Sequence, residues 1–127
     1  MTALKRFEPQ IFAVARMVFG FLFMMHGGQK LLGWFGGAPA EMPVPLLYLS
    51  GGIELVGGIM IAIGLFTGYV AFLASGLMAG AYFMVHQTQG ALPIQNHGEL
   101  AVLYCWVFLI YAVKGSGIWS VDDMRGA

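Results

Sequence analysis

Long apolar runs, interrupted by very few ionisable side chains, constrain this chain more than any other feature. Between residues 11 and 33 the polar side chains are only Arg16, His26, Gln29 and Lys30. At about 1.5 Å per residue, a run of about 20 such residues matches the thickness of a bilayer. Only 9% of the 127 residues are charged, against about 25% in an average soluble domain. The pattern therefore favours a membrane protein over a soluble helical core.

Four apolar segments, separated by proline, glycine and polar loops, predict four helices. We expect an all-α fold, a four-transmembrane-helix bundle in which residues 1–127 form one domain. The third and fourth segments are short, so we expect tilt or interfacial ends there. A polar loop should join them, and Ser120 to Asp123 should form a short capped turn. The predicted spans are residues 11–32, 45–66, 69–86 and 99–113.

The few basic residues near the helix ends predict the orientation. Lys5, Arg6, Lys114 and Arg125 flank the two ends of the chain, whereas the loop between the third and fourth spans has no Lys or Arg. Since cytoplasmic loops carry the excess of Lys and Arg, we expect both termini to be cytoplasmic. The first span should be retained rather than cleaved, because a signal-peptide core is short and uncharged.

Small residues recur where helices are expected to pack. Helices in lipid associate through close backbone approach, which glycine allows. In the first span, Arg16, Gly20, Phe23, Gly27 and Lys30 repeat at helical spacing and share one face. That face should point into the bundle rather than toward lipid. The glycines expected to pack helices together are Gly20, Gly27, Gly57, Gly58, Gly76 and Gly80.

Ionisable groups from different spans are expected to meet inside the bundle. Counting residues from the helix ends places most of them in the outer half, whereas Arg16 should lie near the inner side, snorkelling inward or reaching toward Glu54. Charged groups are costly in hydrocarbon, so they must pair or serve a function. The expected polar or ligand site comprises His26, Lys30, Glu54 and Glu99, with Asn96 and His97 above them and Arg16 as an outlying member.

This polar cluster has three interpretations. It could be a structural network that fixes helix register. It could be a ligand site at which Glu54 and His26 exchange protons with a quinone while Lys30 balances charge; the slot for its ring would be Phe19, Phe23, Met24 and Met25. It could also bind a metal through His26, His86, His97, Glu54 and Glu99, but their spacing matches no compact metal motif, so we expect no metal.

Composition excludes several other functions. The net charge is zero, which gives no reason to expect nucleic-acid binding, and the single cysteine, Cys105, cannot form an internal disulfide or a dithiol pair. No phosphate-binding or dinucleotide-binding glycine motif is present. We therefore expect no intrinsic cofactor, and quinone remains the candidate ligand.

Motifs along nearly the whole chain are familiar in combination. The first span has Arg16, Gly20, His26-Gly27 and Lys30, and the second has Glu54, Gly57-Gly58, Gly64-Leu65 and Thr67. Asn96-His97-Gly98-Glu99 opens the fourth span, and Gly115 to Gly117 precedes Trp119-Ser120-Val121-Asp122. Over about residues 11–123 this pattern resembles the DoxX family of small bacterial membrane proteins. The chain departs from it at His97, where the family usually has glycine.

The resemblance implies four transmembrane helices in the bacterial inner membrane and an association with membrane redox chemistry. Some relatives are subunits of thiosulfate:quinone oxidoreductase, and others join complexes that handle oxidative or thiol stress. We therefore predict an integral-membrane subunit of a quinone-linked or oxidative-stress redox complex. Whether the chain is itself catalytic stays open.

Two alternatives also stay open. The chain could be a non-catalytic accessory, assembly or structural subunit, with its charges fixing only its shape. It could instead transport a small solute, which four short helices would do only as a homo-oligomer. In each case the expected partners are the lipid bilayer and either other membrane subunits or further copies of the chain.

Overall fold

The computed structural model describes residues 1–39 and 41–127, and within them every regular element is helical. The expectation of an all-α chain is thus confirmed. Four rods dominate: α2 (Glu8–Leu32); α3 (Val44–Gly52) continued by the π-helical η2 (Ile53–Gly57) and α4 (Gly58–Ile63); α5 (Thr67–Ala81) continued by the π-helical η3 (Tyr82–His86); and α7 (Glu99–Lys114). The short elements are α1 (Thr2–Lys5), η1 (Trp34–Gly36), η4 (Gln87–Gln89), α6 (Pro93–Asn96) and α8 (Val121–Met124).

Three of the rods are long and apolar enough to cross a membrane. They are Glu8–Leu32, Val44–Ile63 and Thr67–Gln89, with 25, 20 and 23 residues. The third is longer than its sequence indicated, because helical turns continue through η3 and η4 into the expected polar loop. Helix α7 has 16 residues, or about 24 Å at the usual rise, which is shorter than a hydrocarbon core of about 30 Å.

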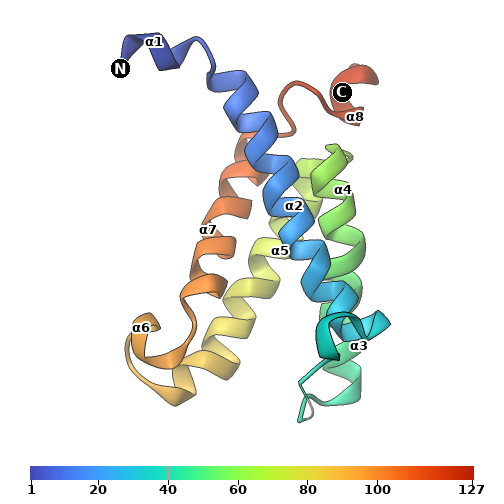
Figure 1. The fold of residues 1–127 in the computed structure, drawn as a ribbon, viewed down its shortest axis with the longest axis vertical. Coiled ribbons are helices and arrows are strands. Elements are labelled where there is room, and N and C mark those ends of the chain that lie inside the picture. The colour runs from blue at the N-terminus through green and yellow to red at the C-terminus, as the bar shows by residue number, and fades with distance from the viewer. Residues whose placement is uncertain (40) are drawn as a thin grey trace.

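The rods pack as two pairs that diverge (Figure 1). Helix α2 packs against α3, η2 and α4, and α5 packs against α7. Both termini lie at one end of the molecule, which we call the terminal end, and α3 and α6 lie at the other, which we call the loop end. The pairs lie close together near the terminal end and separate toward the loop end.

Glycines bring the backbones of the first pair into contact. A Cβ added at Gly20 would lie 2.4 Å from the Ala62 nitrogen, and one added at Gly58 would lie 2.4 Å from the Met24 nitrogen. At Gly27 an added Cβ would likewise overlap the backbone of the η2 rod. Because only hydrogen fits at these points, glycine permits the close crossing of α2 over its neighbour.

The other three expected packing positions, one in the first pair and two in α5, behave differently. Gly57 faces α5, where its nearest neighbour is the Val70 side chain at 3.3 Å. At Gly76 and Gly80 an added Cβ would meet nothing within 4 Å in the part of the chain that the structure describes. The expectation that Gly76 and Gly80 pack helices of this chain together therefore needs correction: their face of α5 points outward.

Aromatic rings join the two pairs at mid-height. The Phe23 ring of α2 lies 4.7 Å from the Phe108 ring and 5.4 Å from the Tyr104 ring, both on α7. Nearer the terminal end, the Phe12 and Tyr111 rings are 4.5 Å apart. These contacts close the space between the pairs on the terminal side and leave it open on the loop side.

The C-terminal loop (115–120) is tied down at the terminal end. Arg16 is fully buried, and its guanidinium donates to the carbonyl oxygens of Ser116, Ile118 and Trp119. It neither snorkels nor reaches Glu54: its two terminal nitrogens bind backbone carbonyls about a hundred residues away, whereas its buried Nε has no hydrogen-bond partner among the described residues. Ser120 accepts the Asp123 N–H at 3.0 Å, which confirms the expected capped turn at α8.

Asp122 joins this loop to the start of α5. Its carboxylate accepts the N–H groups of Phe66 and Thr67 at 2.9 and 3.2 Å and the hydroxyl of Ser116. It therefore caps a helix that has no side-chain cap of its own. Burial acts to raise the pKa of Asp122, but these hydrogen bonds and nearby Arg125 outweigh it and hold the pKa below its ordinary value.

Candidate functional site

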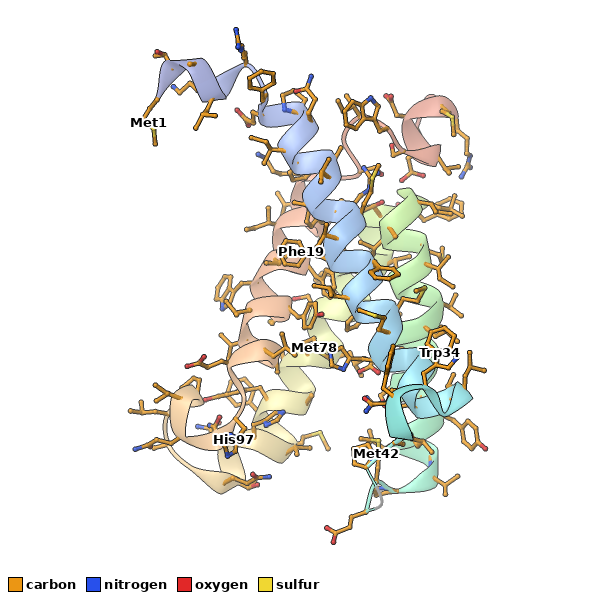
Figure 2. All side chains as sticks on the ribbon, viewed as in Figure 1. Met1, Phe19, Trp34, Met42, Met78 and His97 are labelled. Atoms are coloured by element: carbon orange, nitrogen blue, oxygen red, sulfur yellow. The ribbon has the colours of Figure 1, made fainter. Side chains whose placement is uncertain are left out.

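A cavity of about 290 Å³ lies between the diverging pairs. All four rods contribute to it, so its shape depends on the packing of the whole molecule. Figure 2 shows Met78 between the pairs, and Met42 and His97 on opposite sides near the loop end. The wall is mostly apolar. Its polar members are His26, Lys30, Glu54, His86 and His97, and the rest are Phe23, Met42, Met78, Ala81, Val85, Leu100, Ala101 and Tyr104.

An ion pair forms one wall of the cavity. The Lys30 Nζ on α2 lies 2.8 Å from the Glu54 Oε1 and 3.1 Å from the Ser50 hydroxyl oxygen. Glu54 is only 3% exposed. Its second oxygen, Oε2, is buried and has no hydrogen-bond partner among the described residues. A buried polar atom without a partner is costly, so this oxygen would be stabilised by a hydrogen-bond donor.

Two π-helical segments shape the same cavity. Glu54 lies in η2, and Val85 and His86 lie in η3. A π-turn inserts one extra residue into a helix, which turns side chains to new directions and occurs frequently at functional sites. Both π segments of the described chain therefore flank one polar cavity, from rods that belong to different pairs.

All three histidines of the chain line this cavity. The His26 ring on α2 stands edge-on to the Tyr104 ring at 6.1 Å. The His86 Nδ1 lies 3.2 Å from the Asn96 carbonyl oxygen. Because a carbonyl only accepts, Nδ1 carries the hydrogen, and in the neutral ring Nε2 is left as an acceptor. The site thus combines hydrogen-bond donors and acceptors.

Asn96 does not line the cavity, but its hydrogen bonds order the loop that carries His97. It is fully buried. Its amide donates to the Gly90 carbonyl at 3.1 Å and to the Tyr82 hydroxyl at 3.3 Å, and its carbonyl accepts the Gly98 N–H at 2.9 Å. These contacts fix the loop before α7. They hold His97 in the left-handed region, with φ of 59°.

The structure brings together only some of the residues expected in the site. His26, Lys30, Glu54 and His97 line one cavity. Glu99 is exposed and does not line it, and Arg16 lies at the terminal end. Of the expected ring slot, Phe23 lines the cavity and Met25 lines an adjoining groove.

Among the side chains of the wall that can form hydrogen bonds, sequence reasoning missed two, His86 and Tyr104. His86 was considered only as a metal ligand, since it ends the predicted third span. Its position at the same predicted depth as His97 was the available signal. Tyr104 gave no polar signal within an apolar helix. Among the described residues, no group of three or more His, Cys, Asp or Glu side chains is placed to hold a metal ion.

The fold and this cavity define a helical membrane protein with a polar interior site. The sequence profile of the DoxX family matches residues 11–87, and the chain belongs to that family. An uncharacterized protein of Haemophilus influenzae is 38% identical over 129 residues, covering 97% of this chain and 96% of that one.

Two further relatives carry descriptive names. The "Inner membrane protein YqjF" of Escherichia coli is 28% identical, with 95% of this chain and 96% of that protein covered. The "Putative oxidoreductase CatD" of Bacillus subtilis is 27% identical, with 84% of this chain and 81% of that protein covered. No solved structure matches the chain.

Proposed function

We propose that this chain is a quinone-binding subunit of a redox complex in the bacterial inner membrane, and that α7 is its fourth span. Helix α7 is apolar and packs along α5, so modest tilt of its neighbours or local thinning of the bilayer would accommodate its length. The basic residues Lys5, Arg6, Lys114 and Arg125 favour a cytoplasmic terminal end. The cavity would then open toward the periplasmic side.

The observation that carries the proposal is the polar cavity itself. A quinone offers a flat apolar ring with a carbonyl oxygen at each side. The wall supplies apolar surface from Phe23, Met78 and Ala101, and polar groups from the Lys30–Glu54 pair and the histidines. A volume of about 290 Å³ is near the lower end of the range for small-molecule sites, about 300–1,000 Å³, and suits a head group.

The residues present fit the chemistry of such a head group. A quinone accepts two electrons and two protons when it is reduced. Lys30 and a protonated histidine can donate a hydrogen bond to a carbonyl oxygen, and Glu54 Oε2 can accept one from a hydroxyl group. The same groups can pass protons to or from that oxygen. With one cysteine, the chain has no dithiol pair, so the electrons would come from a partner subunit. The name of the Bacillus relative is consistent with this role.

The direct test is quinone binding by the purified chain in lipid nanodiscs. We expect Glu54→Gln to weaken binding about tenfold or more, a loss of about 1.4 kcal/mol, because the charged acceptor in the cavity is lost. Glu99→Gln is the matched control, since Glu99 is exposed and outside the cavity. It should bind as the wild type does.

A double variant separates binding from folding. Glu54→Gln alone leaves Lys30 without its carboxylate, which destabilises a buried pair. Lys30→Met/Glu54→Gln removes both charges together, so it should keep the melting temperature closer to that of the wild type and still fail to bind quinone. Quinone binding that survives in this variant would refute the proposal.

An assembly role remains the second candidate because of one observation. The outward face of α5 carries Gly76 and Gly80, with no described neighbour within 4 Å of an added Cβ. A helix of another subunit could approach the backbone there. Loss of a co-purifying subunit in Gly76→Leu/Gly80→Leu, with quinone binding unchanged, would favour this role.

A further inference from the structure

A second hollow adjoins the cavity on the outside of the molecule. This groove has a volume of about 460 Å³ and is lined by Leu22, Met25, His26, Gln29, Phe35, Leu100 and Tyr104. His26, Leu100 and Tyr104 belong to both hollows. The groove and the cavity therefore share a wall between α2 and α7.

The position of the groove explains why it is open. Helices α2 and α7 belong to different pairs, and the pairs diverge toward the loop end (Figure 1). Phe23 and Phe108 close the space nearer the terminal end, with rings 4.7 Å apart. On the loop-end side of that contact, side chains at the outer edge of the groove are exposed: Leu22 is 38% and Phe35 is 72% exposed. In a bilayer this edge faces lipid.

We propose that the groove between α2 and α7 is a lateral portal that receives the isoprenoid tail of the quinone whose head group binds in the cavity. This inference rests on the proposed function and adds the route of entry and the requirement for a tail. A lipid-soluble ligand could then reach the Lys30–Glu54 pair from the bilayer without crossing the aqueous phase.

Two observations favour the tail over other occupants. The groove adjoins the polar cavity at three shared side chains, His26, Leu100 and Tyr104, so one molecule that passes between these side chains would place its head in the cavity and its chain in the groove. Leu22 to Gln29 covers two turns of α2, about 10 Å along the helix. A larger apolar groove of about 650 Å³ lies at the terminal end, but it shares no lining residue with the cavity.

The test compares two probes with the full chain in nanodiscs. One probe is a benzoquinone without a side chain, and the other is the same head group with an isoprenoid chain. Met25→Trp fills the groove without touching the cavity, because Met25 lines only the groove. Met17→Trp is the matched control on the same helix, since Met17 is exposed and lies outside both hollows.

We expect Met25→Trp to weaken binding of the tailed probe about tenfold or more, equal to about 1.4 kcal/mol, and to leave the tail-less probe within about twofold. Met17→Trp should change neither. Leu22→Trp, at a partly exposed position of the groove, serves as a second variant if Met25→Trp lowers the melting temperature. If both groove variants bind the tailed probe as the wild type does, or lose affinity for both probes equally, the portal is refuted and the proposed quinone-binding function still stands.

Wild-type results separate the two proposals. If the wild-type chain binds neither probe, the proposed function fails and the portal fails with it. If it binds both probes with equal affinity, the head-group site stands and the tail groove is refuted.

Discussion

At the scale of single residues, His97 combines an unfavourable backbone conformation with a place in the cavity wall. Its φ of 59° lies in the left-handed region, which costs roughly 1–2 kcal/mol for a residue with a Cβ. Glycine at this position would fit that conformation without strain. The imidazole of His97 lines the cavity beside the other two histidines.

Two substitutions at His97 separate the backbone from the side chain. His97→Gly relieves the strain and His97→Ala keeps it, so thermal unfolding in detergent should rank Gly above Ala by about 1 kcal/mol. Both remove the imidazole and should weaken quinone binding to the same extent. If the glycine variant is less stable than the alanine variant, residue 97 does not carry the strain of a left-handed backbone conformation.

The residue scale also shows what sequence reasoning could reach. Depth counting placed His26, Lys30 and Glu54 in the outer half of the bundle, because the positions of residues along regular helices follow from a constant rise. The partners of Arg16 could not be found in this way. They are carbonyl oxygens of an irregular loop. Because every residue has a backbone carbonyl, the sequence does not indicate which of them bind a side chain.

At the scale of helices, the glycines divide into those that contact a neighbouring backbone and those that do not. Gly58→Ala would place its Cβ 2.4 Å from the Met24 nitrogen, so α2 and α4 must move apart at a cost of about 1–3 kcal/mol. Gly76→Ala meets nothing within 4 Å among the described residues and should be neutral or slightly stabilising in detergent. Melting temperatures of the two variants measure the difference. Equal melting temperatures would contradict the close crossing.

Sequence patterns located the rods but not the turns within them. Apolar length and breakers predicted where each rod lies, and the joint glycine pattern predicted close packing. The π segments η2 and η3 gave no such signal, because one extra residue in a turn leaves the apolar composition unchanged. These segments carry Glu54 and His86 into the cavity wall.

At the scale of the whole molecule, one end is fastened and the other is open. Aromatic contacts and the C-terminal loop hold the two helix pairs together at the terminal end, and the cavity occupies the space where the pairs diverge. Asp122 is central to the fastening, because its carboxylate joins the C-terminal loop to the first turn of α5. The width of the cavity therefore depends on contacts far from it.

This arrangement predicts acid sensitivity at the terminal end. The pKa of folded Asp122 lies below its ordinary value, which is about 3.9 in an unfolded chain. The ionised carboxylate therefore stabilises the fold above about pH 4, and that contribution is lost as the pH falls through the folded pKa. Asp122→Asn should lower stability near neutral pH by about 1 kcal/mol, as for a lost helix cap, and flatten the decline below pH 4.

The control is the exposed pair of Glu8 and Lys114, whose atoms are 3.8 Å apart. Since exposed ion pairs contribute little, Glu8→Gln should keep both the stability and the acid slope of the wild type. Thermal unfolding of the three proteins in one detergent, scanned from neutral to acidic pH, measures both quantities.

The contacts of Asp122 at the terminal end also predict that limited proteolysis of Asp122→Asn begins in the C-terminal loop. Cleavage beginning instead at the loop end would show that Asp122 does not hold the two helix pairs together.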